Sequence, residues 1–170
     1  MGTRRRYLLP VLCAILLAAS CSNPYEQLSL VLLTDKDQLQ GGISFDMMLE
    51  QGYSYSTAVV CRIDAGMLLK ENVELAFEVI SPNHESFKET VIFPLVQNER
   101  QRAALGSDTA QIQYKRHGGW LDNQWGWRSG ITCDTLPGRW RVIISSKNDM
   151  DLKRIRAIGF SYKGIADEQE

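Results

Sequence analysis

The chain has 170 residues, of which 44% are hydrophobic, and its 19 basic and 20 acidic residues leave a formal net charge of −1. This length is sufficient for one domain with a buried core. The near-balanced charge argues against the basic surface that nucleic-acid binding requires, so we expect no nucleic-acid partner.

The first 20 residues have the pattern of a secretory signal sequence. Three arginines at positions 4–6 precede an apolar run from Tyr7 to Ala19, which is shorter than the about 20 residues of a membrane span. Its end, LAASC, resembles a bacterial lipobox, although Ala18 stands where leucine is more usual. The resemblance implies that Cys21 becomes a lipidated first residue and anchors the protein in a membrane. The alternative is an ordinary signal peptide that leaves Cys21 unmodified.

We divide the chain into four parts. Residues 1–20 are expected to be the lipoprotein signal peptide, and residues 21–26 a lipidated tether. Residues 27–163 are expected to form one folded domain, followed by a disordered polar tail over 164–170. Three of the 19 basic residues lie before residue 21, so the remaining chain is mildly acidic.

Within the domain, apolar and polar residues alternate with a period of two, which is typical of strands with one buried face. The expected strands are 43–49, 55–63, 73–79, 87–93, 139–144 and 156–162. Turn residues over 81–85 predict a hairpin between the third and fourth of these. The charged segment 97–106 is either a helical turn or an exposed loop. The pattern predicts an all-β fold, an antiparallel β-sandwich of immunoglobulin-like or jelly-roll-like type with about eight strands.

Two cysteines remain after the signal peptide and the lipidated residue are set aside. Cys61 and Cys133 either form a disulfide, as the extracytoplasmic context permits, or are separate buried thiols on different strands. The sequence has no CxxC motif and no cysteine–histidine cluster. We therefore expect no zinc site and no cofactor.

Three stretches of the domain, together with the lipobox, resemble the gliding-motility lipoprotein GldH family of Bacteroidota. They are ISFDMMLEQGYSYSTAVVCRID (43–64), VELAFEVISPN (73–83) and LPGRWRVIISSKNDMDLKRIRAIGFSYK (136–163). The residues that occupy the family's positions are Tyr53 or Tyr55, Arg62, Pro137, Gly138, Leu152, Ile155, Ile158 and Gly159.

This resemblance implies a lipoprotein of the outer membrane that supports gliding motility or a related cell-surface machinery. The implied partners are other envelope proteins of the gliding or secretion apparatus, bound without catalysis. Ser22, which follows the lipidated cysteine, and the absence of a dense acidic run after it favour an outer-membrane location facing the periplasm.

The sequence contains no motif of a known catalytic site. GxSxG, HExxH and the P-loop are absent. Of the two histidines, His84 is expected to be an exposed turn residue, and His117 has no carboxylate at a spacing that would indicate a catalytic pair. Asn148, Asp149 and Asp151 alternate oxygen-bearing side chains, but a Ca²⁺ site takes about six to eight oxygens. We expect a solvated turn there, no bound metal, and a protein that is not an enzyme.

The stretch HGGWLDNQWGWRSG (117–130) contains three of the four tryptophans. If it is extended, Trp125 and Trp127 face the same side, with Trp120 across a turn at residues 122–123. Three interpretations stay open: packing in the sandwich core or at its edge, a protein interface, or contact with a glycan. The candidate interface or glycan contacts are Trp120, Trp125, Trp127, Asp122, Asn123 and Arg128.

Overall fold

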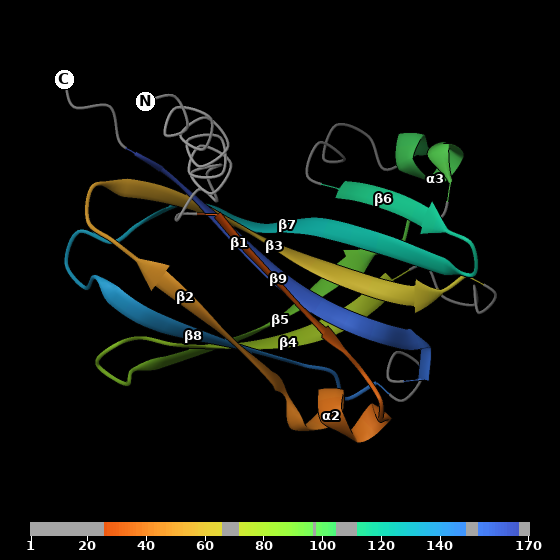
Figure 1. Cartoon of the computed structure of the whole chain (residues 1–170), viewed down its shortest axis with the longest axis horizontal. Coiled ribbons are helices and arrows are strands. Elements are labelled where there is room, and N and C mark those ends of the chain that lie inside the picture. The colour runs from red at the N-terminus through yellow and green to blue at the C-terminus, as the bar shows by residue number, and fades with distance from the viewer. Residues whose placement is uncertain (1–25, 66–71, 97, 105–111, 149–152, 167–170) are drawn as a thin grey trace, which may run out of the picture.

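A computed structural model describes residues 26–65, 72–96, 98–104, 112–148 and 153–166 and confirms the all-β antiparallel sandwich (Figure 1). The strands are β1 (Glu26–Leu32), β2 (Ile43–Leu49), β3 (Tyr53–Asp64), β4 (Asn72–Ile80), β5 (Ser86–Pro94), β6 (Ile112–His117), β7 (Trp120–Thr132), β8 (Gly138–Ser145) and β9 (Ile155–Ala166). The described helices are α2 (Lys36–Gly41) and α3 (Glu99–Ala104). α3 occupies most of the charged segment 97–106, for which the sequence left both a helical turn and an exposed loop possible.

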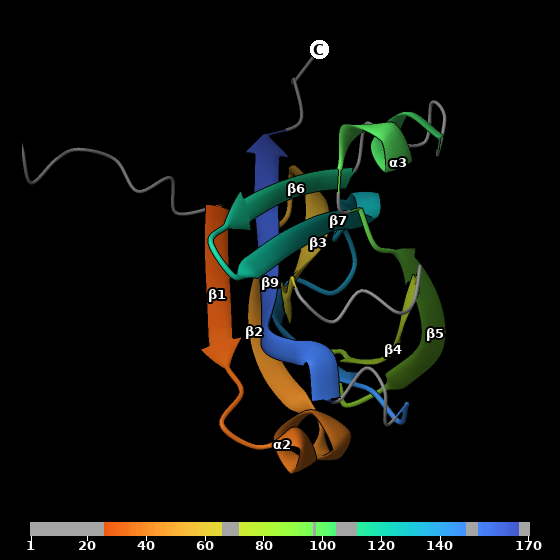
Figure 2. The same cartoon turned by 90° about the vertical axis from the view of Figure 1, so that its right-hand side faces the viewer.

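The strands form two layers (Figure 2). The larger sheet has the order β1-β9-β3-β7-β6, and the smaller sheet has the order β2-β8-β4-β5. All the pairings are antiparallel, and the hairpin predicted around 81–85 is the β4–β5 pair. Its left-handed residue is His84, with φ 67°.

The core lies between the two sheets because each strand turns its apolar residues inward. β2 shows this clearly: Ile43, Phe45, Met47 and Leu49 are buried, and the residues between them are exposed. The hydroxyl of Tyr55 also bridges the layers. The backbone N–H of Glu50 donates to Oη of Tyr55 at 2.8 Å.

Both ends of the described domain extend beyond the boundaries predicted from the sequence. β9 continues to Ala166, which pairs with Tyr53 of β3. Residues 164–166 are therefore strand, so the prediction that disorder begins at Gly164 was wrong. These three residues, Gly164, Ile165 and Ala166, have no polar side chains, and their backbone pairs with the central strand β3. At the other end, β1 already begins at Glu26, the last residue of the predicted tether.

Of the two alternatives left open for Cys61 and Cys133, the disulfide does not form, because both cysteines are free and buried. Cys133 directly follows Thr132, which pairs with Ser54, whereas Cys61 lies seven residues further along the same β3 strand. At about 3.3 Å per residue, this separation is about 23 Å. A disulfide needs Cα atoms within about 7 Å. The alternative of separate buried thiols holds.

Several predictions fall outside the described residues. These are the signal peptide, the lipidation of Cys21, the turn with Asp149 and Asp151, the family position at Leu152, and the last four residues of the tail. Within the described ranges, the helices are too short and too polar to cross a membrane.

Candidate functional site

Strand geometry divides the tryptophan-rich stretch between two faces of the larger sheet. Its described part from residue 120 is the strand β7, in which buried and more exposed residues alternate. Residues 122 and 123 pair with Arg62 and Cys61 of β3, so the turn predicted there was wrong. The chain turns instead at Gly118, which has φ 56°. Glycine adopts this left-handed conformation readily.

Two candidate residues of the stretch lie in the core. Trp125 is 1% exposed, stacks on Phe93 with ring centroids 4.8 Å apart, and donates its indole N–H to the Pro94 carbonyl at 2.7 Å. Asn123 is fully buried, and its Oδ1 accepts the backbone N–H of Val96 at 2.8 Å. Neither side chain is available to a ligand, which supports the packing interpretation for both.

Trp127 and Arg128 lie at the open side of the sandwich. Trp127 stacks on Phe77 with centroids 4.3 Å apart, and its indole N–H donates to Glu89 at 2.8 Å. Because Phe77 and Phe93 both belong to the smaller sheet, the prediction that Trp125 and Trp127 face the same side is confirmed.

Next to Trp127, Arg128 makes an ion pair and two contacts with aromatic rings. Its Nη2 lies 2.8 Å from Oε2 of Glu89, and its guanidinium lies over the rings of Phe87 and Trp127, at 5.5 and 5.4 Å from their centroids. Such stacking on aromatic faces is favoured for arginine.

Beside the Arg128–Glu89 pair, an apolar cleft of about 520 Å³ opens between the two sheets. Its apolar walls include Met47, Leu49, Phe87, Ile131 and Trp140. Phe87 is 52% exposed. The cleft thus presents aromatic surface to solvent next to a charged pair.

Of the three tryptophans in the stretch, Trp120 differs because it is 42% exposed. Trp120, Asp122 and Gln124 occupy alternate positions of β7, opposite in direction to the buried Leu121 and Asn123. They therefore belong to the outer face of the larger sheet.

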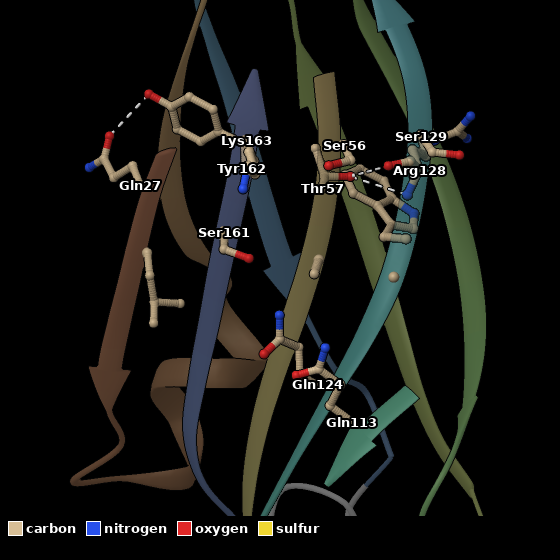
Figure 3. A pocket seen from close by; sticks show the side chains of 14 residues that line it. Gln27, Ser56, Thr57, Gln113, Gln124, Arg128, Ser129, Ser161, Tyr162 and Lys163 are labelled. Carbon is tan, nitrogen blue, oxygen red and sulfur yellow. Dashed lines mark hydrogen bonds between the residues drawn. The ribbon is translucent and has the colours of Figure 1, made fainter. Parts of the chain in front are cut away.

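On this outer face, a groove of about 420 Å³ runs over all five strands (Figure 3). Small residues line its middle, namely Ser56, Ala58, Gly126 and Ser161. Neutral hydrogen-bonding side chains also line it, among them Gln27 of β1 and the register neighbours Gln113 of β6 and Gln124 of β7. Figure 3 shows the Gln27 amide oxygen accepting the hydroxyl of Tyr162, at 3.1 Å.

A pair of register shifts in the β3–β7 ladder shapes one end of the groove. They lie on either side of Thr57. The Thr57 hydroxyl donates to the Arg128 carbonyl at 3.3 Å and accepts the Arg128 backbone N–H at 3.1 Å (Figure 3). Such bulges bend a strand and redirect its side chains. Arg128 therefore borders both the groove and the apolar cleft.

The described lining of the groove contains few charged side chains. Among the described residues that line it, Lys163 and Arg128 carry charge and none is an aspartate or glutamate. The lining therefore offers no carboxylate pair for general acid–base work. Over the described ranges, no three side chains of histidine, cysteine, aspartate or glutamate come together as metal ligands.

Next to the groove, the outer face becomes charged. Arg62 and Asp122 face each other across β3 and β7, and the Asp122 hydrogen bond raises the pKa of Arg62. Nε2 of His117 lies 3.9 Å from Oδ2 of Asp122. His84, by contrast, is an exposed residue of the β4–β5 turn.

The sequence analysis did not identify the groove residues on β3 and β9. The available signal was the run of small residues at alternate positions of β3, Ser54, Ser56 and Ala58, on the face opposite to its apolar residues. Small residues at alternate positions leave room above a sheet. Without the pairing of β3 with β9, however, the matching Ser161 cannot be placed beside them.

No protein-family model and no curated protein sequence matches the chain. A solved structure, described as TmCBM61 in complex with beta-1,4-galactotriose, aligns over 85% of this chain and 90% of that chain, with 12% identity and a TM-score of 0.30. This TM-score is too low for that complex to bear on the ligand of this chain.

Proposed function

We propose that this protein is a non-catalytic binding module that takes a glycan chain in the groove on the outer face of the larger sheet. One observation carries the proposal: the groove has small residues along its middle, and most of the residues that line it carry a neutral amide or hydroxyl. Sugar hydroxyls both donate and accept hydrogen bonds, and amide side chains such as Gln113 and Gln124 can do the same. The groove volume is within the usual range for ligand sites.

The charge of the groove supports a neutral ligand over a polyanion. Lys163 and Arg128 are its two charged residues among those described, and the Glu89 carboxylate pairs with Arg128. A phosphate backbone requires a series of cations along its path. Hydrolysis of a glycan commonly requires two carboxyl groups on either side of the bond, so the proposed activity is binding alone.

In this proposal, the module is held in the cell envelope by a lipid on Cys21. The LAASC sequence and the resemblance to the GldH family support an outer-membrane lipoprotein that faces the periplasm. Each methylene of an acyl chain contributes about 0.8 kcal/mol when buried in a bilayer, and more than one chain gives stable anchoring. A tethered module of this kind would keep its binding face close to envelope polysaccharide.

A second candidate function is protein docking within a gliding-motility or secretion apparatus. The apolar cleft supports it, because it combines the exposed Phe87 with the half-buried Trp140 and with Arg128, and aromatic residues and arginine are enriched at protein interfaces. Crosslinking in native membranes tests it by comparing wild type with Phe87→Glu and with Thr90→Glu, a change at an exposed position on the same strand. Docking at the cleft predicts that defined envelope partners are lost only with Phe87→Glu.

A glycan array followed by calorimetry on the purified mature lipoprotein in detergent tests the main proposal. Ser161→Trp would fill the middle of the groove, and Thr90→Trp would place the same ring on the other sheet. We expect wild type and Thr90→Trp to bind the same neutral glycans, and Ser161→Trp to lose at least about tenfold in affinity. Absence of any bound glycan, or unchanged binding by folded Ser161→Trp, would overturn the proposal.

A further inference from the structure

We infer that the glycan-binding face continues from the groove along β7 to Trp120, which forms a second sugar contact used only by chains longer than the groove. This inference rests on the proposed function and adds to it a dependence on chain length. It separates the role of Trp120 from those of the other tryptophans in the stretch.

The first argument is the uneven burial of the four tryptophans. Trp125 lies in the core, Trp127 stacks on Phe77, and Trp140 is half-buried with its indole N–H donating to the Leu136 carbonyl at 3.2 Å. Trp120 keeps 42% of its surface exposed. An indole has a large apolar face that is stabilised when a sugar ring or another apolar surface covers it.

The second argument is alignment with the groove. Gly126, Gln124, Asp122 and Trp120 follow one another at alternate positions on the outer face of β7, and the first two line the groove. Trp120 lies four positions before Gln124, which is a distance of about 13 Å along an antiparallel strand. A ligand that lies along β7 and fills the groove must therefore extend beyond it to reach the indole.

The third argument is the polar surface between these two points. The Arg62–Asp122 pair lies between Gln124 and Trp120, and Lys115 is opposite Asp122 on β6. The two hydrogen bonds between Arg62 and Asp122 hold both side chains in position. Each group keeps further hydrogen-bonding capacity, because a guanidinium has five N–H donors and a carboxylate about four lone-pair sites. Sugar hydroxyls can use this capacity.

The test is a ladder of size-sorted oligosaccharides of the neutral glycan identified by the array, measured by calorimetry with the mature lipoprotein. The variants are Trp120→Ala, Trp120→Phe and, as a matched control, Ile92→Ala, which removes an exposed apolar side chain from the smaller sheet. Urea unfolding midpoints equal to that of the wild type establish that each variant is folded.

We expect Trp120→Ala to weaken the longest chains by about tenfold and to leave the shortest chains within about twofold of wild type. Trp120→Phe restores most of the lost affinity, because it keeps an aromatic face, and Ile92→Ala changes nothing. Equal effects at all chain lengths, or no effect of Trp120→Ala, overturn the inference.

The same data distinguish the two proposals. If the wild type binds no glycan, or if Ser161→Trp binds every chain normally, the proposed function fails and the inference fails with it. If Ser161→Trp abolishes binding while Trp120→Ala binds all chains normally, only the inference fails. Concentration-dependent dimerisation that is lost in Trp120→Ala, without a length effect on glycan binding, would instead assign the indole to a contact between copies of this chain.

Discussion

Arg62 on β3 and Asp122 on β7 are joined by two hydrogen bonds, Nε to Oδ1 and Nη2 to Oδ2, each 2.7 Å long. Their side chains are only 31% and 20% exposed, so the pair is shielded from water more than a typical surface ion pair. This fork-to-carboxylate geometry is the strong form of a charged hydrogen bond. It connects the two central strands on the face that carries the groove.

A double-mutant cycle measures this pair. We expect Arg62→Gln and Asp122→Asn each to lower the free energy of unfolding by about 1 kcal/mol or more, with a coupling energy of about 1 kcal/mol that decreases in high salt. Urea unfolding at low and high salt provides the measurement. A coupling energy indistinguishable from zero at low salt would contradict this prediction.

Gly159 of β9 lies opposite Leu30 of the neighbouring strand β1, which approaches it closely. A Cβ at this position would lie 2.9 Å from Cδ1 of Leu30 and 2.9 Å from the carbonyl oxygen of Ser29. Because the second contact is with backbone, we expect Gly159→Ala to destabilise the protein by about 1–3 kcal/mol. Gly119→Ala is the control, since a Cβ there has open space. Equal unfolding midpoints for the two variants would show that β1 moves aside without cost.

Arg154 is 2% exposed, and within the described part of the chain none of its guanidinium nitrogens has a hydrogen-bond acceptor. A buried charge without a partner opposes folding, and an apolar side chain of similar length removes this cost. We expect Arg154→Met to raise the free energy of unfolding by about 1–4 kcal/mol. The exposed Arg156→Met serves as the control and should change it by less than about 0.5 kcal/mol. Destabilisation by Arg154→Met would refute the prediction.

Asp46 on β2 accepts a hydrogen bond from Nη2 of Arg139 on β8. This bond lowers the pKa of Asp46 below 3.8, with the charges of Arg139 and Arg141 acting in the same direction. Because the folded-state pKa is the lower one, the pair stabilises the fold above about pH 4, and this contribution is lost as the pH falls through the lowered pKa.

Replacement of Asp46 by asparagine tests the direction of this effect. We expect Asp46→Asn to be less stable than wild type near neutral pH, and the difference to shrink steadily in acid. Urea unfolding over a pH series measures it, with Glu85→Gln, at an exposed position of the β4–β5 turn, as the control. A difference that is constant with pH would exclude a role for the Asp46 charge.

The strands could be predicted from the sequence where one face is buried. The alternating residues of β2 and β4 gave their inward faces correctly. β1 and β6 were not predicted as separate strands. They are the two edges of the larger sheet, where one side of the backbone has no neighbouring strand and the alternation of burial is weaker.

The candidate site could be predicted only in part. The sequence placed Trp125 and Trp127 on one side of an extended segment, but it did not show that the smaller sheet covers both rings. It also placed a turn at residues 122–123, because aspartate and asparagine favour turns locally. Pairing with Arg62 and Cys61 of β3 overrides that local preference.

The order of apolar and polar residues alone indicates which residues of most strands face inward, since the period of two is a local property of the backbone. The sequence also indicates the acidic charge balance and the turn between β4 and β5. That Ser56, Ser161 and Gln124 line one groove follows only from the folded domain, because strand pairing brings together residues that are far apart in the chain. Such pairing depends on the packing of the whole sandwich, as the exposure of Trp120 and the separation of Cys61 from Cys133 also do.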